Sequence, residues 1–513
     1  MPLDTQGQPC LESSHDQKFI FMNFANFVRR RVFYLSAPLF FSLFALPNFA
    51  EPVTIHVGAD KPGAAIPGDF TGLSFEVSQL LPGANGQHYF RPDNEPLIHL
   101  FRSLGIKNLR IGGNTSDRNA GRLPTEADFD SLFGFAKAAD VKVIYCLRLY
   151  EGDAAADVAT VKYIMGHYAP YVEAFSIGQE PSAYPAQRGP DTRAASERMG
   201  GAAEKYPYSA YRDGWKKFEE AIVAAVPEVK FCGPSVHNNA NWAKEFLGDF
   251  GQNNHVALIT EHLYPGGAGG KVPTPEIGRA RMLGADFTKA DEKLYNGLQP
   301  LSASTGLPYR LEEANNYFNG GATNVSSTFA AALWGLDFMY WWAEHDCAGL
   351  NFHTGDRVSA GASLAPSRYT AFFTGTNGYV IRPLGYGIKA FDIGSHGRRL
   401  PVNIDPTNLN LTAYAILSVD KHCYVTVINK ENGDGAREAE VKLEAGTFMS
   451  AQIMFLTAPN IADTSGLTLG GAGIGNDGGW EGKWTQLTPH DGTLDIKVAA
   501  STAAIVELQI AEK

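Results

Sequence analysis

Between residues 69 and 396 the chain alternates short apolar runs with segments patterned as amphipathic helices. The eight apolar runs are Phe70–Glu76, Asn108–Ile111, Val141–Leu147, Tyr171–Ile177, Val229–Gly233, Val256–Glu261, Pro308–Glu312 and Ala348–Phe352. Helical patterns such as Asp128–Ala139, Tyr211–Val226 and Ser326–His345 lie between them. Eight strand–helix units in succession predict an α/β fold, a (β/α)8 TIM barrel whose site residues stand at the C-terminal ends of the strands.

The rest of the chain has a different pattern. From 397 to 513, strand-like runs such as Leu411–Leu417, Tyr424–Ile428 and Ala503–Leu508 are separated by Gly, Asn and Asp turns, with no helical pattern between them. This predicts a C-terminal antiparallel β-sandwich domain. The run Val53–Val57 also alternates, so we expect residues 51–68 to add a strand to that sandwich. A chain of 513 residues is too long for one core, which agrees with two domains.

The first 50 residues are predicted to be a leader. Arg29–Arg31 precede the apolar run Val32–Leu46, and Ala50 supplies a small residue at the expected cleavage point. This order is typical of a secretory signal peptide, and translation from Met22 would give it a more usual length. The alternative is an uncleaved membrane anchor, although the run is short for a span and contains Pro38. We therefore expect an exported protein, secreted or periplasmic, with no stable membrane association after the leader is removed.

Charge and cysteine content limit the partners. The formal net charge is −11 and no long basic run occurs, so nucleic-acid binding is not expected. The five cysteines form no CxxC or Cys/His cluster, which favours buried free thiols over disulfides or a metal site. No His/Asp/Glu set has metal-ligand spacing, and no nucleotide-binding loop lies in a strand–helix context. The sequence therefore predicts neither a metal nor a cofactor, and it leaves the oligomeric state open.

Two predicted strands end in a carboxylate within a distinctive motif. Glu180 closes the fourth strand in Gly-Gln-Glu-Pro, and Glu313 closes the seventh in Glu-Glu-Ala-Asn-Asn-Tyr. They are 133 positions apart (313 − 180), which fits about three strand–helix units. Two carboxylates on different strands of one barrel can converge on a single bond, and glycoside hydrolysis requires that arrangement.

The two carboxylates differ in their expected roles. Glu180 is the candidate acid/base. Pro181 should hold it extended, and a nearby second carboxylate should raise its pKa. Its alternative is a solvated loop carboxylate. Glu313 is the candidate nucleophile, with Glu312 as rival, because neighbours on a strand point to opposite faces. For Glu312 we favour a structural role.

Other polar groups stand at or near strand ends. They are Glu76, Asn114, His262, Tyr264 and His353. Such groups suit the recognition of sugar hydroxyls, and aromatic rings supply stacking faces. For His262 and His353 we favour a structural interpretation. Gly320 and Gly321 follow Glu313 closely and would let backbone N–H groups approach a ligand.

These motifs together resemble glycoside hydrolase family 79, the heparanase and β-glucuronidase family of clan A. The resemblance covers most of the chain after the leader, and it rests on Leu109–Gly113, Gly178–Pro181, Gly233–Pro234, His262–Tyr264, Glu313–Tyr317 with Gly320–Gly321, Asn351–Gly355 and the barrel-then-sandwich order. It implies a retaining β-glycosidase with Glu180 as acid/base and Glu313 as nucleophile. It also implies a carbohydrate substrate and places Tyr264 near the nucleophile.

Three positions depart from the family's pattern. Gln179 stands where the family usually has an Asn that bonds the sugar 2-OH, and Arg148 stands where an Asn usually ends the third strand. Phe318 replaces a Tyr that helps to grip the uronic carboxylate, whereas the glycine that offers an N–H to that carboxylate is retained as Gly320. The expected substrate-binding residues are Glu76, Gln179, Tyr264, Phe318, Gly320 and Gly321.

Three functions stay open. The leading one is an exported retaining β-glucuronidase. Phe318 favours the second, the same chemistry on a neutral β-glycoside such as a glucoside. Arg148 is a candidate replacement cation for a glucuronide, with a structural ion pair as its alternative. The third is a non-catalytic carbohydrate-binding relative, which the retention of both Glu180 and Glu313 disfavours.

Overall fold

The computed structural model describes residues 52–117, 121–185, 206–360, 363–490 and 492–510. The predicted leader, residues 1–50, and the alternative start at Met22 lie outside these ranges. Among the described residues, no helix combines the length and the apolar character needed to cross a membrane.

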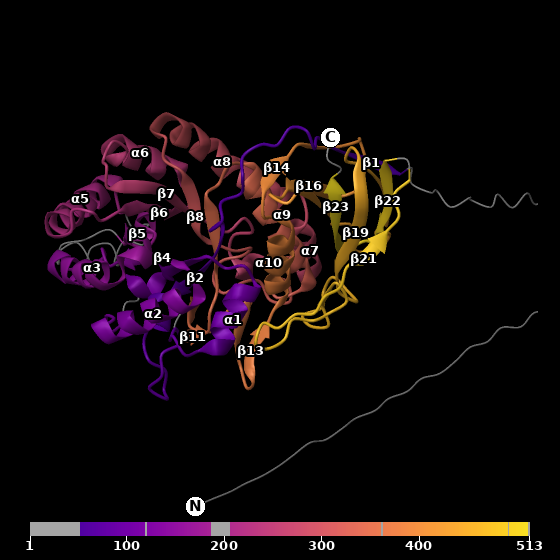
Figure 1. Ribbon diagram of the computed structural model, residues 1–513. Coiled ribbons are helices and arrows are strands. Elements are labelled where there is room, and N and C mark those ends of the chain that lie inside the picture. The colour runs from indigo at the N-terminus through magenta and orange to yellow at the C-terminus, as the bar shows by residue number, and fades with distance from the viewer. Residues whose placement is uncertain (1–51, 118–120, 186–205, 361–362, 491, 511–513) are drawn as a thin grey trace, which may run out of the picture. The chain divides into compact units, whose positions relative to one another are not determined.

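Eight parallel strands close into a barrel in chain order (Figure 1). They are β2 (Thr71–Glu76), β3 (Asn108–Gly112), β4 (Lys142–Leu147), β5 (Val172–Ile177), β6 (Phe231–His237), β7 (Val256–Leu263), β8 (Tyr309–Ala314) and β9 (Gly349–His353). The helices that follow them are α1 (Glu95–Ser103), α2 (Glu126–Ala139), α3 (Ala154–Tyr168), α5 (Tyr208–Ala225), α6 (Ala240–Phe250), α7 (Pro275–Met282), α8 (Ala285–Thr305), α9 (Phe329–Glu344) and α10 (Pro383–Gly394). This confirms the predicted (β/α)8 barrel.

Strand β6 extends further than its sequence pattern indicated. The predicted strand stopped at Gly233, and the next residue, Pro234, lacks the N–H that a central strand uses. In the structure β6 continues through Pro234 to His237. The ladder to β7 shifts register between Pro234 and Val236, and such a bulge accommodates a residue that cannot donate a hydrogen bond.

Strand β8 also runs past its predicted end, to Ala314, so Glu312 and Glu313 both lie within it. Its ladder to β9 is irregular between Leu311 and Ala314, which covers both carboxylates. Glu312 is completely buried, while Glu313 keeps a small exposed fraction of 5%. Both side chains are nevertheless buried, and both approach the ring of His262, at 3.3 and 3.9 Å. The expectation that these neighbours point to opposite faces therefore does not hold at this irregular part of the strand.

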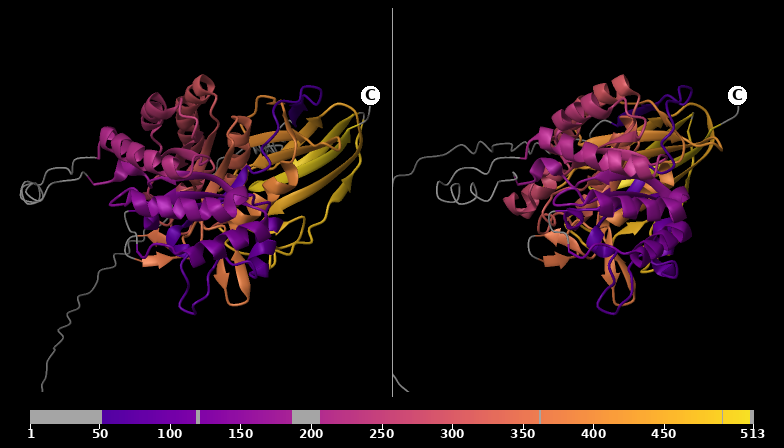
Figure 2. Two further views of the ribbon diagram at one scale, coloured as in Figure 1. Left: turned by 60° about the vertical axis from the view of Figure 1, so that its left-hand side comes forward. Right: turned by 90° about the vertical axis from the view of Figure 1, so that its left-hand side faces the viewer.

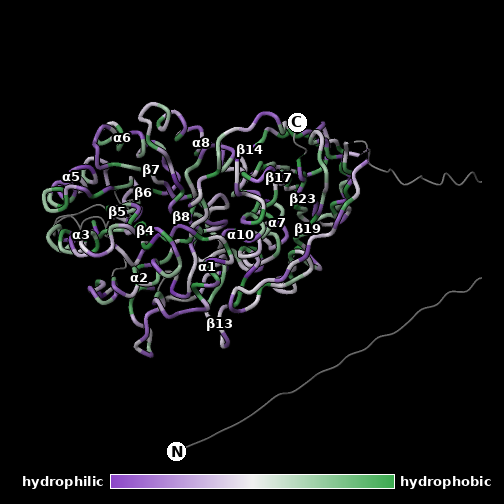
Figure 3. The backbone as a smooth tube through the Cα atoms, viewed as in Figure 1, coloured by the Kyte–Doolittle hydropathy of each residue, from purple (hydrophilic) through white to green (hydrophobic). Residues whose placement is uncertain are grey.

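Helix α9 is apolar around its whole circumference, and such a helix needs cover on every side. Helix α10 packs along it, and the C-terminal strands supply further cover. The rings of Tyr340 on α9 and Tyr414 stack with centroids 4.9 Å apart, and the Tyr340 hydroxyl bonds Thr426 at 3.0 Å. In Figure 3 hydrophobic segments run through the interior around α10, whereas loops at the lower edge are hydrophilic.

Two sheets form the C-terminal sandwich, which confirms the predicted all-β domain (Figure 2). One sheet has the order β15-β1-β18-β22, with β15 (Val402–Ile404), β1 (Val53–Val57), β18 (Ala439–Glu444) and β22 (Thr493–Val498). The other has the order β14-β16-β17-β23-β19-β20, with β14 (Arg398–Leu400), β16 (Leu411–Leu417), β17 (His422–Asn429), β23 (Thr502–Ile510), β19 (Phe448–Thr457) and β20 (Thr468–Leu469), and β21 (Thr485–Leu487) also pairs with β19. The early strand β1 is antiparallel to β15 and parallel to β18.

Two hairpins follow the last barrel strand, in a region to which the sequence analysis assigned no element. They are β10 (Val358–Ala360) with β11 (Ser363–Ala365), and β12 (Phe372–Gly375) with β13 (Gly378–Ile381). They add to the C-terminal side of β9, the side on which a barrel carries its site.

Candidate active site

A tight turn after β5 places Glu180. Gly178 has a φ of 92°, and a Cβ there would lie 2.7 Å from the Tyr184 hydroxyl, so this position requires glycine. The next N–H, that of Gln179, donates to Asp117 Oδ2 at 3.1 Å. The N–H of Glu180 donates to the Ser235 carbonyl at 3.0 Å, which ties the turn to β6.

The backbone of Glu180 differs from the prediction. We expected an extended residue before Pro181, but Glu180 has φ 46° and ψ 56°, in the left-handed region. A side chain in this region is strained, and such strain persists where the surroundings hold the residue in place. The hydrogen bonds on either side of the turn provide that restraint.

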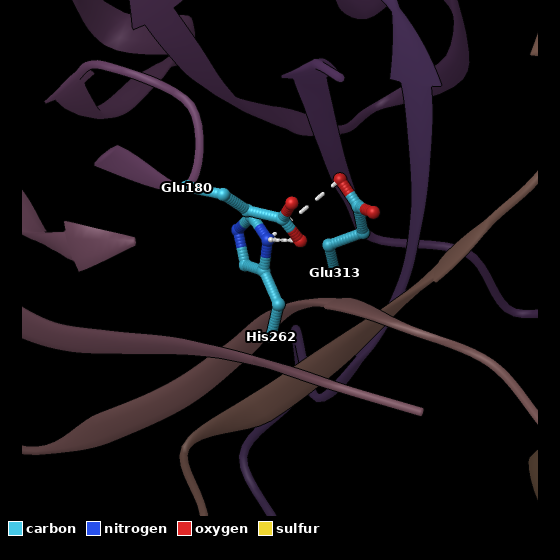
Figure 4. Close-up of side chains that lie close together, drawn as sticks. All are labelled: Glu180, His262 and Glu313. Atoms are coloured by element: carbon cyan, nitrogen blue, oxygen red, sulfur yellow. Dashed lines mark hydrogen bonds and ion pairs between the residues drawn. The ribbon is translucent and has the colours of Figure 1, made fainter. Parts of the chain in front are cut away.

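Glu180, His262 and Glu313 converge in the barrel mouth (Figure 4). A carboxylate oxygen of each glutamate and a ring nitrogen of the histidine all lie within 4.8 Å of one another. His262 Nδ1 lies 3.2 Å from Glu180 Oε1 and 3.9 Å from Glu313 Oε2. Its Nε2 lies 3.3 Å from Glu312 Oε1. The histidine therefore stands between three carboxylates.

Donors surround the Glu313 carboxylate. Arg110 Nη1 donates to Oε2 at 2.7 Å, Gln179 Nε2 donates to the same oxygen at 3.1 Å, and the Tyr264 hydroxyl donates to Oε1 at 2.8 Å. Burial by itself raises the pKa of Glu313, but the charges of His353, His262 and Arg110 and the Tyr264 hydroxyl outweigh burial and hold that pKa well below its usual value. Glu313 is thus an anion at neutral pH.

The position of the proton corrects a second expectation. Burial raises the pKa of Glu180, but the hydrogen bond and charge of His262 lower it further, and the resulting pKa is about 2. We expected a raised pKa from the repulsion of Glu313. That repulsion acts, but the imidazolium outweighs it. Conversely, burial lowers the pKa of His262, while Glu313, Glu180 and Glu312 raise it to about 9.

The His262 and Glu312 pair lies beneath the two candidate catalytic carboxylates. Glu312 is fully buried and its pKa is lowered, because His262 and Arg110 outweigh the effect of burial. The structural role expected for Glu312 stays a prediction. His262 is fully buried and paired with Glu312, which suits a structural histidine, and it also contacts Glu180 directly. His353 lies 4.0 Å from Glu313 and 3.8 Å from Glu76, so it too belongs to the site.

The trio of Glu180, His262 and Glu313 has the ligand types for a metal ion. Its surroundings favour a proton network instead. Arg110 is fully buried 2.7 Å from Glu313, so a metal ion would face a fixed positive charge. Both nitrogens of His262 also face carboxylate oxygens, at 3.2 and 3.3 Å.

A cavity of about 210 Å³ opens above the carboxylates. Its lining consists of Glu76, Asn114, Glu180, His237, Tyr264, Glu313, Phe318, Asn319, His353 and Tyr369. Of the expected substrate-binding residues, Glu76, Tyr264 and Phe318 line it. Gln179 does not, because its amide lies between Arg110 and Glu313 and its exposed fraction is 1%.

The remaining predicted residues lie around this cavity or away from it. Gly320 and Gly321 follow Phe318 in the same loop, with φ of 77° and 88°. Both glycines are buried and neither lines the cavity, so the structure does not bring these two expected substrate-binding residues to the site. Arg148 points elsewhere: its Nε donates to the Tyr150 carbonyl at 3.2 Å, and it does not line the cavity.

Sequence reasoning missed four residues of the site. Arg110 stands inside a motif that was recognised, but its fully buried place beside Glu313 was not foreseen. His237 lies in the part of β6 beyond the predicted strand end. Asn319 and Tyr369 come from loops, and no strand end marks them. Tyr369 packs against Tyr264 at the cavity, with ring centroids 6.0 Å apart.

No family model matches the chain. Two curated relatives match part of it, both named beta-glucuronidase. The protein from Aspergillus niger is 30% identical over 162 residues, 29% of this chain and 30% of the relative. The protein from Neurospora crassa is 25% identical over 156 residues, 28% of this chain and 27% of the relative. The matches thus span less than a third of either relative's length.

Solved structures share the whole architecture. A 4-O-α-L-rhamnosyl-β-D-glucuronidase from Fusarium oxysporum superposes with a TM-score of 0.68 at 18% identity, covering 88% of this chain and 99% of that one. A family 51 arabinofuranosidase from Xanthomonas axonopodis pv. citri gives 0.62 at 12% identity, covering 89% and 100%. The barrel-and-sandwich fold of these glycoside hydrolases is therefore the fold of this chain.

Proposed function

We propose that the protein is a retaining β-glycosidase related to glycoside hydrolase family 79, with Glu313 as nucleophile and Glu180 as acid/base. The observation that carries the proposal is the approach of their carboxylate oxygens to within 4.8 Å. Retaining enzymes hold the two carboxyl groups about 5–5.5 Å apart, whereas inverting enzymes leave about 6.5–9.5 Å for a water molecule. The short separation supports a covalent glycosyl-enzyme.

The charge states support the same roles. Glu313 is held as an anion by four groups and can attack the anomeric carbon. The proton for the leaving oxygen rests on His262, whose Nδ1 lies 3.2 Å from Oε1 of Glu180. It passes from Nδ1 of His262 to Oε1 of Glu180 and from there to the leaving group. When Glu180 then takes a proton from the attacking water, it returns that proton to His262, and the cycle closes.

A β-glucuronide is the proposed substrate. Both curated relatives that match part of this chain are named beta-glucuronidase. The lining of the cavity argues less strongly for a uronic carboxylate, because Gly320 and Gly321 are buried outside it and no Arg or Lys lines it in the part of the chain that the structure describes. Phe318 lines the cavity and lacks a hydroxyl donor, which favours a neutral β-glycoside as the second candidate.

The deciding measurement is kcat/KM on matched aryl β-glucuronides and β-glucosides. We expect the glucuronide to be preferred. Phe318→Tyr should raise the glucuronide-to-glucoside ratio, because a charge-assisted hydrogen bond contributes about 1.5–3 kcal/mol, or roughly tenfold or more. A clear preference for the glucoside would replace the glucuronidase with the neutral glycosidase. Hydrolysis of neither, with sugar binding retained, would indicate a carbohydrate-binding relative.

A further inference from the structure

A second hollow lies beside the catalytic cavity, between the segment that follows β2 and the β12–β13 hairpin. Its volume is about 330 Å³, larger than that of the catalytic cavity. Gln79, Tyr89, Asn94, Asp356, Arg357 and Tyr379 line it, among others. Figures 1 and 2 show the hairpin protruding at the same edge of the barrel as the dark purple loop from the start of the barrel.

The segments that follow two barrel strands, β2 and β9, run from the catalytic cavity to the hollow. Glu76, at the end of β2, lines the catalytic cavity, and Gln79 lines the hollow three residues later. The intervening turn Val77–Gln79 is a 3₁₀ helix, so the step is roughly 6 Å. His353 and Asp356 repeat this spacing after β9. A ligand larger than one sugar unit could therefore reach both cavities.

Two nearly buried amides direct polar atoms into the hollow. Gln79 is 3% exposed, and its Oε1 accepts from the N–H groups of Asp356 and Arg357 at 3.2 and 3.1 Å. Asn94 is 7% exposed, and its Nδ2 donates to the Tyr89 carbonyl at 3.0 Å and to the Tyr379 hydroxyl at 2.8 Å. Backbone partners thus fix both amide orientations. Gln79 Nε2 and Asn94 Oδ1 have no partner among the described residues.

A hydroxyl adds to this pair. The Tyr89 oxygen is buried, and although Tyr379 and Thr374 lie close, it forms no hydrogen bond of normal geometry within the described ranges. A buried hydroxyl without a partner destabilises a folded chain, so its presence here needs an explanation. The rings of Tyr89 and Tyr379 stand 6.0 Å apart and nearly perpendicular, and they supply apolar faces.

The charges around the hollow favour a neutral ligand. Arg91 is paired with Asp93 at 2.9 Å, and Arg357 donates to the carbonyls of Ser78 and Leu81 at 2.7 and 2.9 Å. Asp356, which lines the hollow, and Glu95, in the first turn of α1, balance the arginines. An anion would therefore meet no excess of positive charge.

We propose that this hollow binds a neutral glycosyl residue. An amide donor, an amide acceptor, an unpaired hydroxyl and two aromatic rings match the paired hydroxyl groups and the apolar faces of a pyranose. The residue belongs either to the substrate, beyond the bond that is cleaved, or to a separate glycan. The first of these sources rests on the proposed function; the binding itself does not.

Saturation-transfer NMR tests the binding, with cellotetraose, xylotetraose and laminaritetraose as probes. The full chain carries Glu313→Ala so that the probes stay intact. We expect saturation transfer from the protein to at least one probe. Tyr89→Phe and Gln79→Glu should each reduce this transfer at least threefold. Gln79→Glu keeps the side-chain acceptor oxygen and loses the donor N–H group. Gln486→Glu, the same change at an exposed sandwich position, is the matched control and should have no effect. Tyr89→Phe should keep its Tm, because no hydrogen bond is lost.

Two results would overturn the proposal: transfer to none of the three probes, or transfer that Phe318→Ala reduces and the hollow variants do not, which would place the sugar in the catalytic cavity. Kinetics then separate the sources. If the hollow holds part of the substrate, Tyr89→Phe lowers the ratio of kcat/KM on an oligosaccharyl glycoside to that on an aryl glycoside at least threefold. An unchanged ratio with lost binding assigns the hollow to a separate glycan. If no glycoside is hydrolysed, the proposed function fails while the binding result stands.

Discussion

At the level of single residues, the location of one proton decides what each carboxylate can do. Three glutamates and one histidine share a small buried volume, and four anionic or basic groups so close together cannot all keep their ordinary pKa values. The imidazolium of His262 resolves the conflict, because it faces Glu180 at 3.2 Å and Glu312 at 3.3 Å. In the proposed mechanism, the acid/base Glu180 and its proton reservoir His262 therefore act as one unit.

The first prediction separates the three glutamates. Glu313→Ala should lower kcat/KM by more than about 1,000-fold, since it removes the proposed nucleophile. Azide should then restore turnover and give an α-glycosyl azide. Glu180→Ala should spare substrates with activated aryl leaving groups, and azide should yield the β-azide. Glu312→Ala is the matched control, one residue away on the same strand. An inactive Glu312→Ala beside an active Glu313→Ala would reverse the nucleophile assignment.

The second prediction concerns pH. The pKa of His262 is raised to about 9 in the folded chain. Its contribution to stability is therefore fully present below its unfolded pKa of about 6.5 and is lost as pH rises through about 9. In the proposed mechanism the same proton serves the leaving group, so kcat/KM should fall above pH 9. The low pKa values of Glu180 and Glu313 should preserve the proposed activity at pH 4.

His262→Gln tests whether His262 causes the fall in kcat/KM above pH 9. The substitution should lower kcat by about 100-fold, within the usual range for loss of an acid–base group, and should remove the fall near pH 9. His422→Gln provides the control, because His422 also pairs with a glutamate, Glu507 at 2.6 Å, far along the chain in the sandwich. If kcat/KM of His262→Gln still falls near pH 9, the titration belongs to another group.

At the level of elements, the pattern of the sequence was sufficient for the barrel and insufficient for its rim. Alternation of apolar runs with helical patterns predicts β2 to β9, because the strands of a closed parallel barrel are buried on both sides. The left-handed turn at Glu180 could not be predicted from this alternation. It depends on hydrogen bonds to Asp117 through Gln179 and to Ser235 on β6, which are distant in sequence.

The site residues also fall into two groups: those that the sequence pattern indicates and those that only the folded structure reveals. Glu180, Glu313, Tyr264 and Glu76 stand at or just beyond strand ends, where sequence period and topology both indicate the barrel mouth. Tyr369 and Asn319 reach the cavity from loops, and only tertiary packing brings them there. The direction of the Glu180 pKa shift also needed the structure, since the sequence shows two carboxylates but not the histidine between them.

The third prediction concerns the contact of α9 with the sandwich. Asp337 on α9 accepts from Thr412 Oγ1 at 2.6 Å and from the Tyr414 hydroxyl at 2.8 Å, and it pairs with Lys430 at 2.7 Å. The Lys430 side chain is only 8% exposed. Asp337→Ala should therefore lower the free energy of unfolding by about 3 kcal/mol, because it leaves a buried cation without its partner.

Urea denaturation measures this change, with two comparisons. Lys497→Ala breaks an exposed pair with Glu440 and should change the free energy of unfolding by less than about 1 kcal/mol. Asp337→Leu combined with Lys430→Met should recover much of the loss, since no charge stays buried. A cost below about 1 kcal/mol for Asp337→Ala would show that the contact contributes little.

At the level of the whole molecule, the fourth prediction concerns export. A reporter enzyme fused behind residues 1–50, or behind 22–50, should cross the membrane and be cleaved near Ala50, because a basic segment followed by an apolar run is the signal that the secretion machinery reads. Phe41→Arg interrupts the apolar run and should abolish export. Reporter activity outside the cytoplasm and the mass of the mature product provide the measurement. A reporter retained in the cytoplasm with the wild-type leader would exclude a secreted enzyme.

The place of β1 has a consequence for how the chain is made. Val53 pairs with Val441, 388 positions later (441 − 53), and Ile55 pairs with Ile404. During translation β1 therefore leaves the ribosome first, and its partner strands leave it only after the barrel segments. Until then the backbone N–H and C=O groups of β1 lack their strand partners, and other chains can pair with this exposed edge. Premature stop codons before residue 400 would leave that edge permanently open, and the resulting fragments should aggregate even where the barrel itself has folded.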